Sequence, residues 1–112
     1  MIALALSLTL SVIDGDTLRL GAERIRLSGI DAPELHGCPR QRVCTPGDPV
    51  ASRDALARLV STGPVTIQRH GLDRYGRTLA VIWAGGVNVN CALLAGGYAV
   101  RRYEQRYLGR CE

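Results

Sequence analysis

Lysine is absent from this sequence, so all 14 basic residues are arginine, against ten acidic residues, and the net charge is +4. Phenylalanine is absent too, and only one tryptophan and four tyrosines are present, so the core must be aliphatic. Arginine favours bidentate contacts with phosphate, although a compositional bias of the source genome would leave the same pattern. The modest positive charge therefore permits a polyanionic partner without requiring one.

A long hydrophobic run is also lacking, so we expect no membrane partner. Residues 1–10 are apolar, but they lack the basic segment and the small-residue cleavage site of a leader. Leucines alternate with small residues here, which predicts a first strand from Leu4 to Ile13.

Cysteine is sparse but even in number, at positions 38, 44, 91 and 111. Three pairings are possible. Cys38 and Cys44 share one loop and resemble a local pair, which would leave Cys91 and Cys111 to tie down the C-terminal end. Free thiols remain an alternative, as does a zinc site with His36 and Cys38, although no C-x-x-C pair supports zinc. Disulfides would indicate an oxidising compartment, so we expect a secreted or periplasmic protein.

Hydrophobic periodicity and turn signals predict one domain over residues 1–112, mainly β with helices (α+β). Asp48 and Pro49 have the residue types of a helix start, and Asn88 would cap a second helix from Val89 to Gly96. The first three strands form a meander at short spacing, which is typical of a small barrel. The expected strands cover residues 4–13, 18–20, 25–30, 65–70, 77–84 and 98–102.

The stretch from residue 25 to residue 34 organises the chain. It begins as a strand with Ile25 and Leu27 on one face and Arg26 and Ser28 on the other. It ends in a turn around Pro33 that carries Asp31 and Glu34. An earlier turn carries Asp14 and Asp16 on either side of Gly15.

Turn chemistry alone would explain each of these acidic pairs. Both turns lie at strand ends of one meander, however, so they can converge on one point. Carboxylate oxygens suit Ca²⁺ or Mg²⁺. Arg26 and Arg77 could then stabilise the charge of a phosphodiester attacked by water, while a carboxylate takes up a proton. The alternative for each arginine is a solvated strand face, and we expect only surface or structural roles for His36 and His70.

These residues resemble the staphylococcal nuclease (thermonuclease) family. The resemblance covers about residues Leu8 to Tyr103 and rests on four short motifs in order. It implies a five-stranded OB-type β-barrel with two or three packed helices. It also implies a calcium-dependent endonuclease that hydrolyses DNA and RNA at the 5′ P–O bond and leaves 3′-phosphates. The motifs are residues 14–17, 26–34, 73–77 and 89–90, the last before an Ala-Leu-Leu helix.

The resemblance also implies roles for individual acidic residues. Asp16, Asp31 and the backbone carbonyl of Ala32 would bind Ca²⁺. Glu34 would act as the general base, and Asp14 would support the metal ligands without touching the ion.

Basic and aromatic residues receive implied roles in the same way. Arg26 and Arg77 would bind the phosphate and stabilise the transition state. Arg74, Tyr75 and Tyr103 would contact the nucleotide.

Two features depart from the family pattern. The family has a longer third helix after the barrel, so we expect the C-terminal helix to be shortened or truncated. A bridge between Cys38 and Cys44 would stiffen the loop beside Glu34.

Two functions of other classes stay open. A non-catalytic OB-fold module would bind single-stranded nucleic acid through a basic groove and aromatic stacking. A disulfide-stapled structural or interaction domain would keep the fold without the chemistry. Nothing in the sequence suggests an interface, so we expect a monomer.

Overall fold

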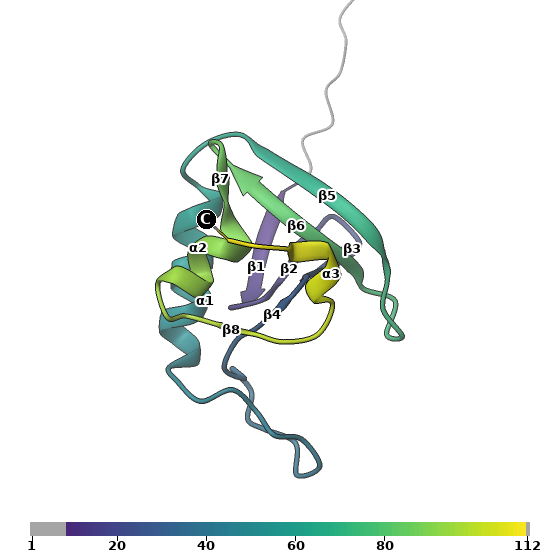
Figure 1. Cartoon of the computed structure of the whole chain (residues 1–112), viewed down its shortest axis with the longest axis vertical. Coiled ribbons are helices and arrows are strands. Elements are labelled where there is room, and N and C mark those ends of the chain that lie inside the picture. Colours follow the sequence, from purple (N-terminus) through teal and green to yellow (C-terminus); the bar gives the residue numbers. More distant parts are fainter. Residues whose placement is uncertain (1–8, 112) are drawn as a thin grey trace, which may run out of the picture.

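The computed structural model describes residues 9–111, which form a mixed α+β fold (Figure 1). The predicted α+β class is therefore confirmed. The strands are β1 (Leu10–Asp14), β2 (Thr17–Leu20), β3 (Glu23–Leu27), β4 (Ile30–Asp31), β5 (Val65–Leu72), β6 (Thr78–Ala84), β7 (Val87–Asn88) and β8 (Val100–Arg101). The helices are α1 (Pro49–Val60), α2 (Val89–Ala95) and α3 (Gln105–Leu108).

Most strands belong to one sheet in the order β1-β2-β3-β6-β5, with β7 paired to β6. The neighbours are antiparallel except β3 and β6, which run parallel. A second, two-stranded sheet joins β4 to β8. Within residues 9–111, β1 and β5 are the two ends of the larger sheet, so closure into a five-stranded barrel stays a prediction.

The predicted first strand is present in part. Strand β1 begins at Leu10 and runs to Asp14, paired with β2. Residues 4–8 of the predicted strand lie outside the described residues.

The predicted strand 25–30 is broken in the middle. Strand β3 ends at Leu27, and Gly29 adopts a φ of +79°, which side chains other than glycine rarely accept. A Cβ on Gly29 would also lie 2.7 Å from the Leu108 Cβ. The chain therefore bends, and both Arg26 and Ser28 are buried instead of facing solvent.

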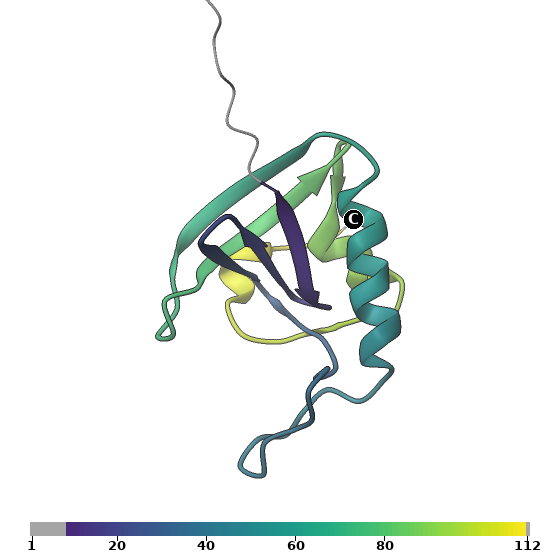
Figure 2. The ribbon, with the colours of Figure 1, turned by 180° about the vertical axis from the view of Figure 1, so that it is seen from behind.

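Helix α1 starts where the sequence predicts. The Asp48 side chain accepts hydrogen bonds from the backbone N–H groups of Val50 and Ala51, and Pro49 occupies the first turn. The helix packs beside β1, as Figure 2 shows from behind. Its Leu56 side chain is fully buried.

Helix α2 is capped by Asn88, whose side chain accepts from the Cys91 N–H, as predicted. Its fully buried Asn90 joins three segments. Asn90 Oδ1 accepts from the Ile82 N–H at 3.1 Å, and Nδ2 donates to the Ser28 and Ala80 carbonyls at 2.9 and 3.2 Å. Asn90 therefore fixes the bend after β3 against β6.

The core is aliphatic, as the absence of phenylalanine requires. Helices α1 and α2 and the inner face of the sheet contribute its largest fully buried apolar side chains. These are Leu18, Ile25, Leu27, Ile30, Leu56, Ile82, Val89 and Leu93.

Two disulfides are present, Cys38–Cys44 and Cys91–Cys111, which is the pairing favoured by the loop positions. The first closes a small ring in the loop after β4, and the second ties the C-terminal segment to α2. A zinc site using Cys38 is therefore excluded, and so are free thiols. No helix among those described is long and apolar enough to cross a membrane.

Candidate functional site

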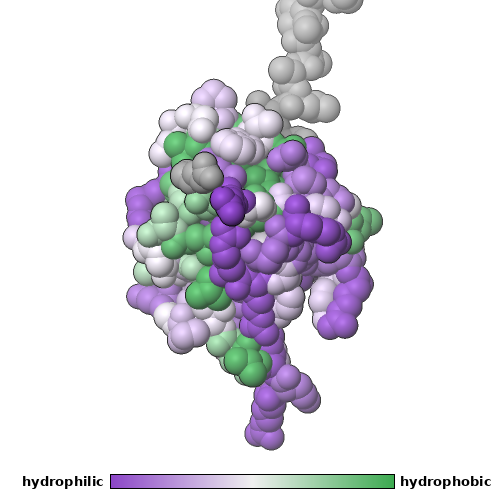
Figure 3. All heavy atoms as spheres, in the orientation of Figure 1, coloured by the Kyte–Doolittle hydropathy of each residue, from purple (hydrophilic) through white to green (hydrophobic). Residues whose placement is uncertain are grey.

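A groove of about 1350 Å³ brings the predicted site side chains together. The face of the molecule around β8, α3 and the projecting loop is largely hydrophilic (Figure 3). A second groove, of about 650 Å³, is lined mainly by apolar residues and holds none of the predicted site residues. The polar groove is lined by Asp14, Asp16, Arg26, Asp31, Glu34, Arg74, Tyr75, Arg77 and Tyr103, among others.

The turn between β1 and β2 holds two carboxylates close together. Asp14 Oδ1 accepts from the Asp16 N–H at 3.2 Å. Gly15 allows this turn to press against α1, since a Cβ there would lie 2.7 Å from the Ser52 Cβ and 2.8 Å from the Ala32 Cβ. This packing fixes the turn, and with it Asp14 and Asp16, at the wall of the groove.

These two carboxyl groups differ in their pKa values. Burial and the neighbouring Asp16 raise the pKa of Asp14 to about 7. Burial also acts on Asp16, but the charge of Arg26 and hydrogen bonds from Asp14, Ala32 and Thr17 outweigh it and lower the pKa of Asp16. Asp16 is therefore the more acidic member of the pair.

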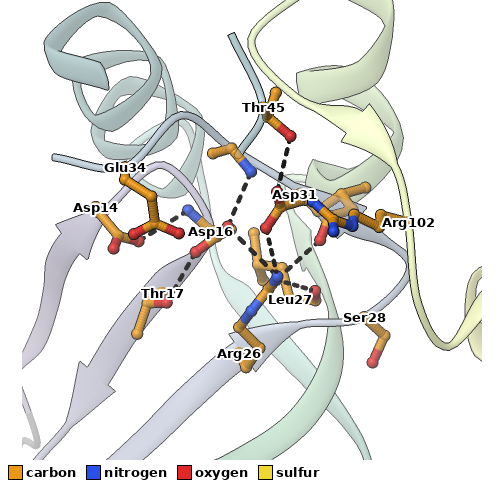
Figure 4. Close-up of polar contacts among 12 residues, drawn as sticks. Asp14, Asp16, Thr17, Arg26, Leu27, Ser28, Asp31, Glu34, Thr45 and Arg102 are labelled. Carbon is orange, nitrogen blue, oxygen red and sulfur yellow. Dashed lines mark hydrogen bonds and ion pairs between the residues drawn. The ribbon is translucent and has the colours of Figure 1, made fainter. Parts of the chain in front are cut away.

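Asp31 is fully buried and surrounded by donors (Figure 4). Its Oδ1 accepts from Arg26 at 3.0 Å and from Arg42 at 2.7 Å. Its Oδ2 accepts from Thr45 Oγ1 at 2.7 Å, and Arg102 lies 3.5 Å away. Burying a charged group is costly unless it is paired, and these donors supply that pairing.

Arg26 connects the two acidic turns. Its Nη2 lies 3.0 Å from Asp31 Oδ1 and 3.5 Å from Asp16 Oδ2. Its Nη1 donates to the carbonyls of Leu27 and Ile30, both at 2.9 Å. Arg26 therefore holds the bend after β3 as well as facing the groove.

Glu34 follows β4 and is partly exposed at the groove. Arg42 pairs with its Oε1 while also contacting Asp31. The carboxylates of Asp31 and Glu34 outweigh the effect of burial and raise the pKa of Arg42. Sequence reasoning did not identify Arg42, because only the conformation of the loop brings it to the carboxylates.

A second arm of the site is the loop from Asp73 to Arg77 after β5. Asp73 Oδ1 accepts from the backbone N–H groups of Tyr75 and Arg77, both at 2.9 Å. Asp73 Oδ2 accepts from Arg77 Nε at 2.7 Å. Burial acts against ionisation of Asp73, but these hydrogen bonds and the charge of Arg77 lower its pKa. Asp73 thus orients Arg77, and sequence reasoning gave it no role.

Aromatic side chains flank the groove and carry arginines on their faces. Arg74 and Arg77 lie 4.9 and 5.4 Å from the centroid of the exposed Tyr75 ring. Arg102 lies 4.8 Å from the centroid of the exposed Tyr103 ring. Exposed aromatic rings beside a basic groove are the kind of side chain on which bases stack.

The donor chemistry fits a hard cation, since the acidic side chains offer only oxygen atoms. Burial and then the charge of Asp16 raise the pKa of Asp14, and a cation beside the two carboxylates would stabilise their charged forms. Among residues 9–111, however, no three His, Cys, Asp or Glu side chains are grouped as they would be around a metal ion. Guanidinium groups lie between the acidic residues instead.

The two histidines lie apart from this chemistry. His36 is exposed on the loop. The His70 ring stacks on Tyr107 with centroids 4.5 Å apart and planes within 7°. This stack holds α3 against β5.

Comparisons with known proteins match most of the chain to one family. A profile of the family described as staphylococcal nuclease homologues matches residues 24–110. The succinoglycan biosynthesis protein ExoI of Rhizobium meliloti (strain 1021) is 39% identical over 95 residues, covering 82% of this chain and 50% of the relative.

Two further relatives carry nuclease names. The thermonuclease of Staphylococcus intermedius is 34% identical over 103 residues, covering 82% of this chain and 56% of the relative. The micrococcal nuclease of Shigella flexneri is 32% identical over 112 residues, covering 88% of this chain and 58% of the relative. The chain therefore spans about half the length of these curated relatives.

Proposed function

The chain belongs to the staphylococcal nuclease family, and from this premise we propose that it is a calcium-dependent endonuclease of DNA and RNA. It hydrolyses the 5′ P–O bond and leaves 3′-phosphates. The observation that carries the proposal is the groove in which Asp16, Asp31 and Glu34 lie with Arg26 and Arg77. A pocket that only binds phosphate would gain nothing from carboxylates that repel it.

Arg77 is the residue best placed to meet the substrate. Its side chain is 26% exposed, and it binds Asp73 through Nε, so its terminal nitrogens remain for a phosphate. A guanidinium in this position neutralises the charge that develops on the phosphoryl oxygens. Arg26, which contacts both Asp16 and Asp31, adds positive charge to the groove.

Glu34 acts as the general base. It takes a proton from the attacking water, and its partial exposure leaves room for that water. Asp16 and Asp31 would hold the ion, together with the carbonyl of Ala32, and Asp14 would support them. When bound, Ca²⁺ supplies positive charge that polarises the phosphate and lowers the pKa of nearby water.

Three residues orient the nucleotide. Tyr75 and Tyr103 present exposed rings at the groove, and Arg74, which lines the same groove, would contact the phosphates. The two disulfides support an extracytoplasmic location, secreted or periplasmic.

The deciding experiment measures hydrolysis of single-stranded DNA with Ca²⁺, with a chelator, and with the Glu34→Gln variant. We expect cleavage that needs both Ca²⁺ and Glu34, leaves 3′-phosphates, and falls by orders of magnitude in Glu34→Gln. Nucleotide binding should survive in that variant. Binding without cleavage by the folded wild type would favour the OB-fold binding module instead.

A further inference from the structure

Every acceptor position of Asp31 is already engaged by a group of the protein itself. Oδ1 accepts from Arg26 and Arg42, at 3.0 and 2.7 Å. Oδ2 accepts from Thr45 Oγ1 at 2.7 Å and from Arg102 at 3.5 Å. Each carboxylate oxygen offers about two lone pairs. A cation that binds Asp31 must therefore replace one of these contacts.

Arg42 and Arg102 can leave Asp31 more easily than Arg26 can, and Arg42 is the one that also contacts Glu34. The Arg26 side chain is 7% exposed and also holds the Leu27 and Ile30 carbonyls, so its departure would undo the bend after β3. The Arg42 side chain is 31% exposed and lies on a loop without regular secondary structure. Arg42 belongs to neither sheet.

The same guanidinium also covers the proposed general base. Arg42 Nη1 pairs with Glu34 Oε1 while Nη2 pairs with Asp31 Oδ1. The Oε1 lone pair that accepts from Arg42 is not free to take a proton from water, so the bridge removes part of the capacity of Glu34 to act as a base. One side chain therefore engages both a proposed metal ligand and the proposed base.

The disulfide keeps Arg42 near these acids. Cys38–Cys44 closes the ring that contains Arg42, and the Arg42 N–H donates to the Pro39 carbonyl at 3.1 Å. The loop projects from the body of the molecule in Figures 1 and 2. A short closed ring limits how far Arg42 can travel, so its effective concentration at Asp31 stays high.

The geometry points to Arg42 as an internal counter-ion that bridges Asp31 and Glu34 in the metal-free protein and withdraws when the cation binds. The inference rests on the proposed function, because it takes Asp31 to be a ligand of the ion. It adds a regulation of that site: metal affinity is set by competition with a residue of the disulfide loop.

Linkage gives the expected effect. The Arg42 bridge forms only in the metal-free protein and stabilises that state. The dissociation constant for the metal is therefore raised by the same factor by which the bridge favours the metal-free state. Removing the Arg42 bridge should therefore tighten Ca²⁺ binding, by at least about fivefold, the lower end of typical couplings between sites.

The test is a calorimetric titration with Ca²⁺ of the wild type and three variants. Arg42→Gln removes charge and bridge together. Arg42→Lys keeps the charge but lacks the planar fork that reaches two carboxylates. Arg40→Gln is the matched control, because Arg40 is exposed on the same loop and takes no part in these contacts.

We expect Arg42→Gln to bind Ca²⁺ at least about fivefold more tightly than the wild type, with Arg42→Lys closer to Arg42→Gln and Arg40→Gln unchanged. If Arg40→Gln tightened Ca²⁺ binding as much as Arg42→Gln, or if Arg42→Lys bound Ca²⁺ with wild-type affinity, net charge alone would explain the effect. Either result would overturn the inference. Circular dichroism verifies that each variant is folded. If Arg42→Gln does not fold, the Ca²⁺ affinity of Arg42→Lys relative to the wild type decides the test.

The outcomes also separate this inference from the proposed function. Ca²⁺-dependent cleavage with equal Ca²⁺ affinity in the wild type and Arg42→Gln overturns the inference alone. No Ca²⁺ binding by either protein overturns the inference and removes the metal from the proposed function as well.

Discussion

Arg26 and Asp31 are five residues apart, and Arg26 Nη2 lies 3.0 Å from Asp31 Oδ1 because the chain bends between them. The same guanidinium donates to two backbone carbonyls within the bend. A residue that the family pattern assigns to phosphate binding is therefore also a structural element of this chain. Stability and chemistry should depend on it together.

The first prediction compares Arg26→Gln with Arg77→Gln. Arg26→Gln should lower the free energy of unfolding by about 2–4 kcal/mol, because it breaks a buried ion pair and leaves carbonyls unpaired. Arg77→Gln should cost at most about 1 kcal/mol, because its partner Asp73 is near the surface. Both variants should lose DNA cleavage. Urea unfolding and a cleavage assay measure the two effects, and equal stability losses would contradict a bend-holding role for Arg26.

The second prediction concerns pH. The pKa of Asp14 is raised from 3.8 to about 7 in the folded protein, so between these values the folded state binds more protons than the unfolded state. The free energy of unfolding should therefore fall as the pH rises through this window. With solvent screening, the loss should be on the order of 1–2 kcal/mol.

Urea unfolding in chelator across that pH range measures this contribution. The Asp14→Asn variant cannot ionise at this position, so its stability should fall less steeply with rising pH. A variant with the slope of the wild type would show that another group is responsible.

Local signals were enough to predict the helix starts. Asp48 before Pro49, and Asn88 before an apolar run, act on backbone groups two or three residues away. The acidic turns were predictable for the same reason. Strand alternation, in contrast, continued through Gly29, because periodicity does not register a single residue with positive φ.

The contacts that sequence reasoning missed are long-range or depend on loop conformation. Arg42 reaches Glu34 through a ring closed by Cys38–Cys44, and Arg102 reaches the same loop by donating to the Val43 carbonyl. No periodic pattern or spacing encodes such contacts. The abundance of arginine was visible, but which arginine would meet which acid was not.

Asn90 provides the third prediction. Asn90→Ala leaves the buried Ile82 N–H and Ser28 carbonyl without their side-chain partner, so it should cost about 2–4 kcal/mol of stability. Asn88→Ala, which removes only a helix cap, should cost about 1 kcal/mol. Chemical denaturation of both variants checks the ranking, and a larger loss in Asn88→Ala would refute it.

The fourth prediction concerns the two disulfides. In the chain-entropy picture, stabilisation grows with the loop that is closed, and the sequence separations are 6 and 20 residues. Replacing Cys91 and Cys111 by serine should cost about 3 kcal/mol, and replacing Cys38 and Cys44 about 2 kcal/mol. Thermal unfolding of each double variant tests this. Addition of a reductant should lower the melting temperature of the wild type, and the absence of any shift would contradict both contributions.

The last prediction concerns Asp73, which accepts three hydrogen bonds within the loop, two of them from Arg77 and one from the Tyr75 N–H. Asp73→Ala should release Arg77 and lower the rate of DNA cleavage by about 100-fold, the cost expected when a catalytic group is displaced by about 1 Å. Stability should change little, because the loop lies at the surface. Asp54→Ala is the matched control, since it removes the same charge from the exposed face of α1. Cleavage by Asp73→Ala at the rate of Asp54→Ala would mean that Arg77 is positioned without Asp73, or that Arg77 does not act on the substrate.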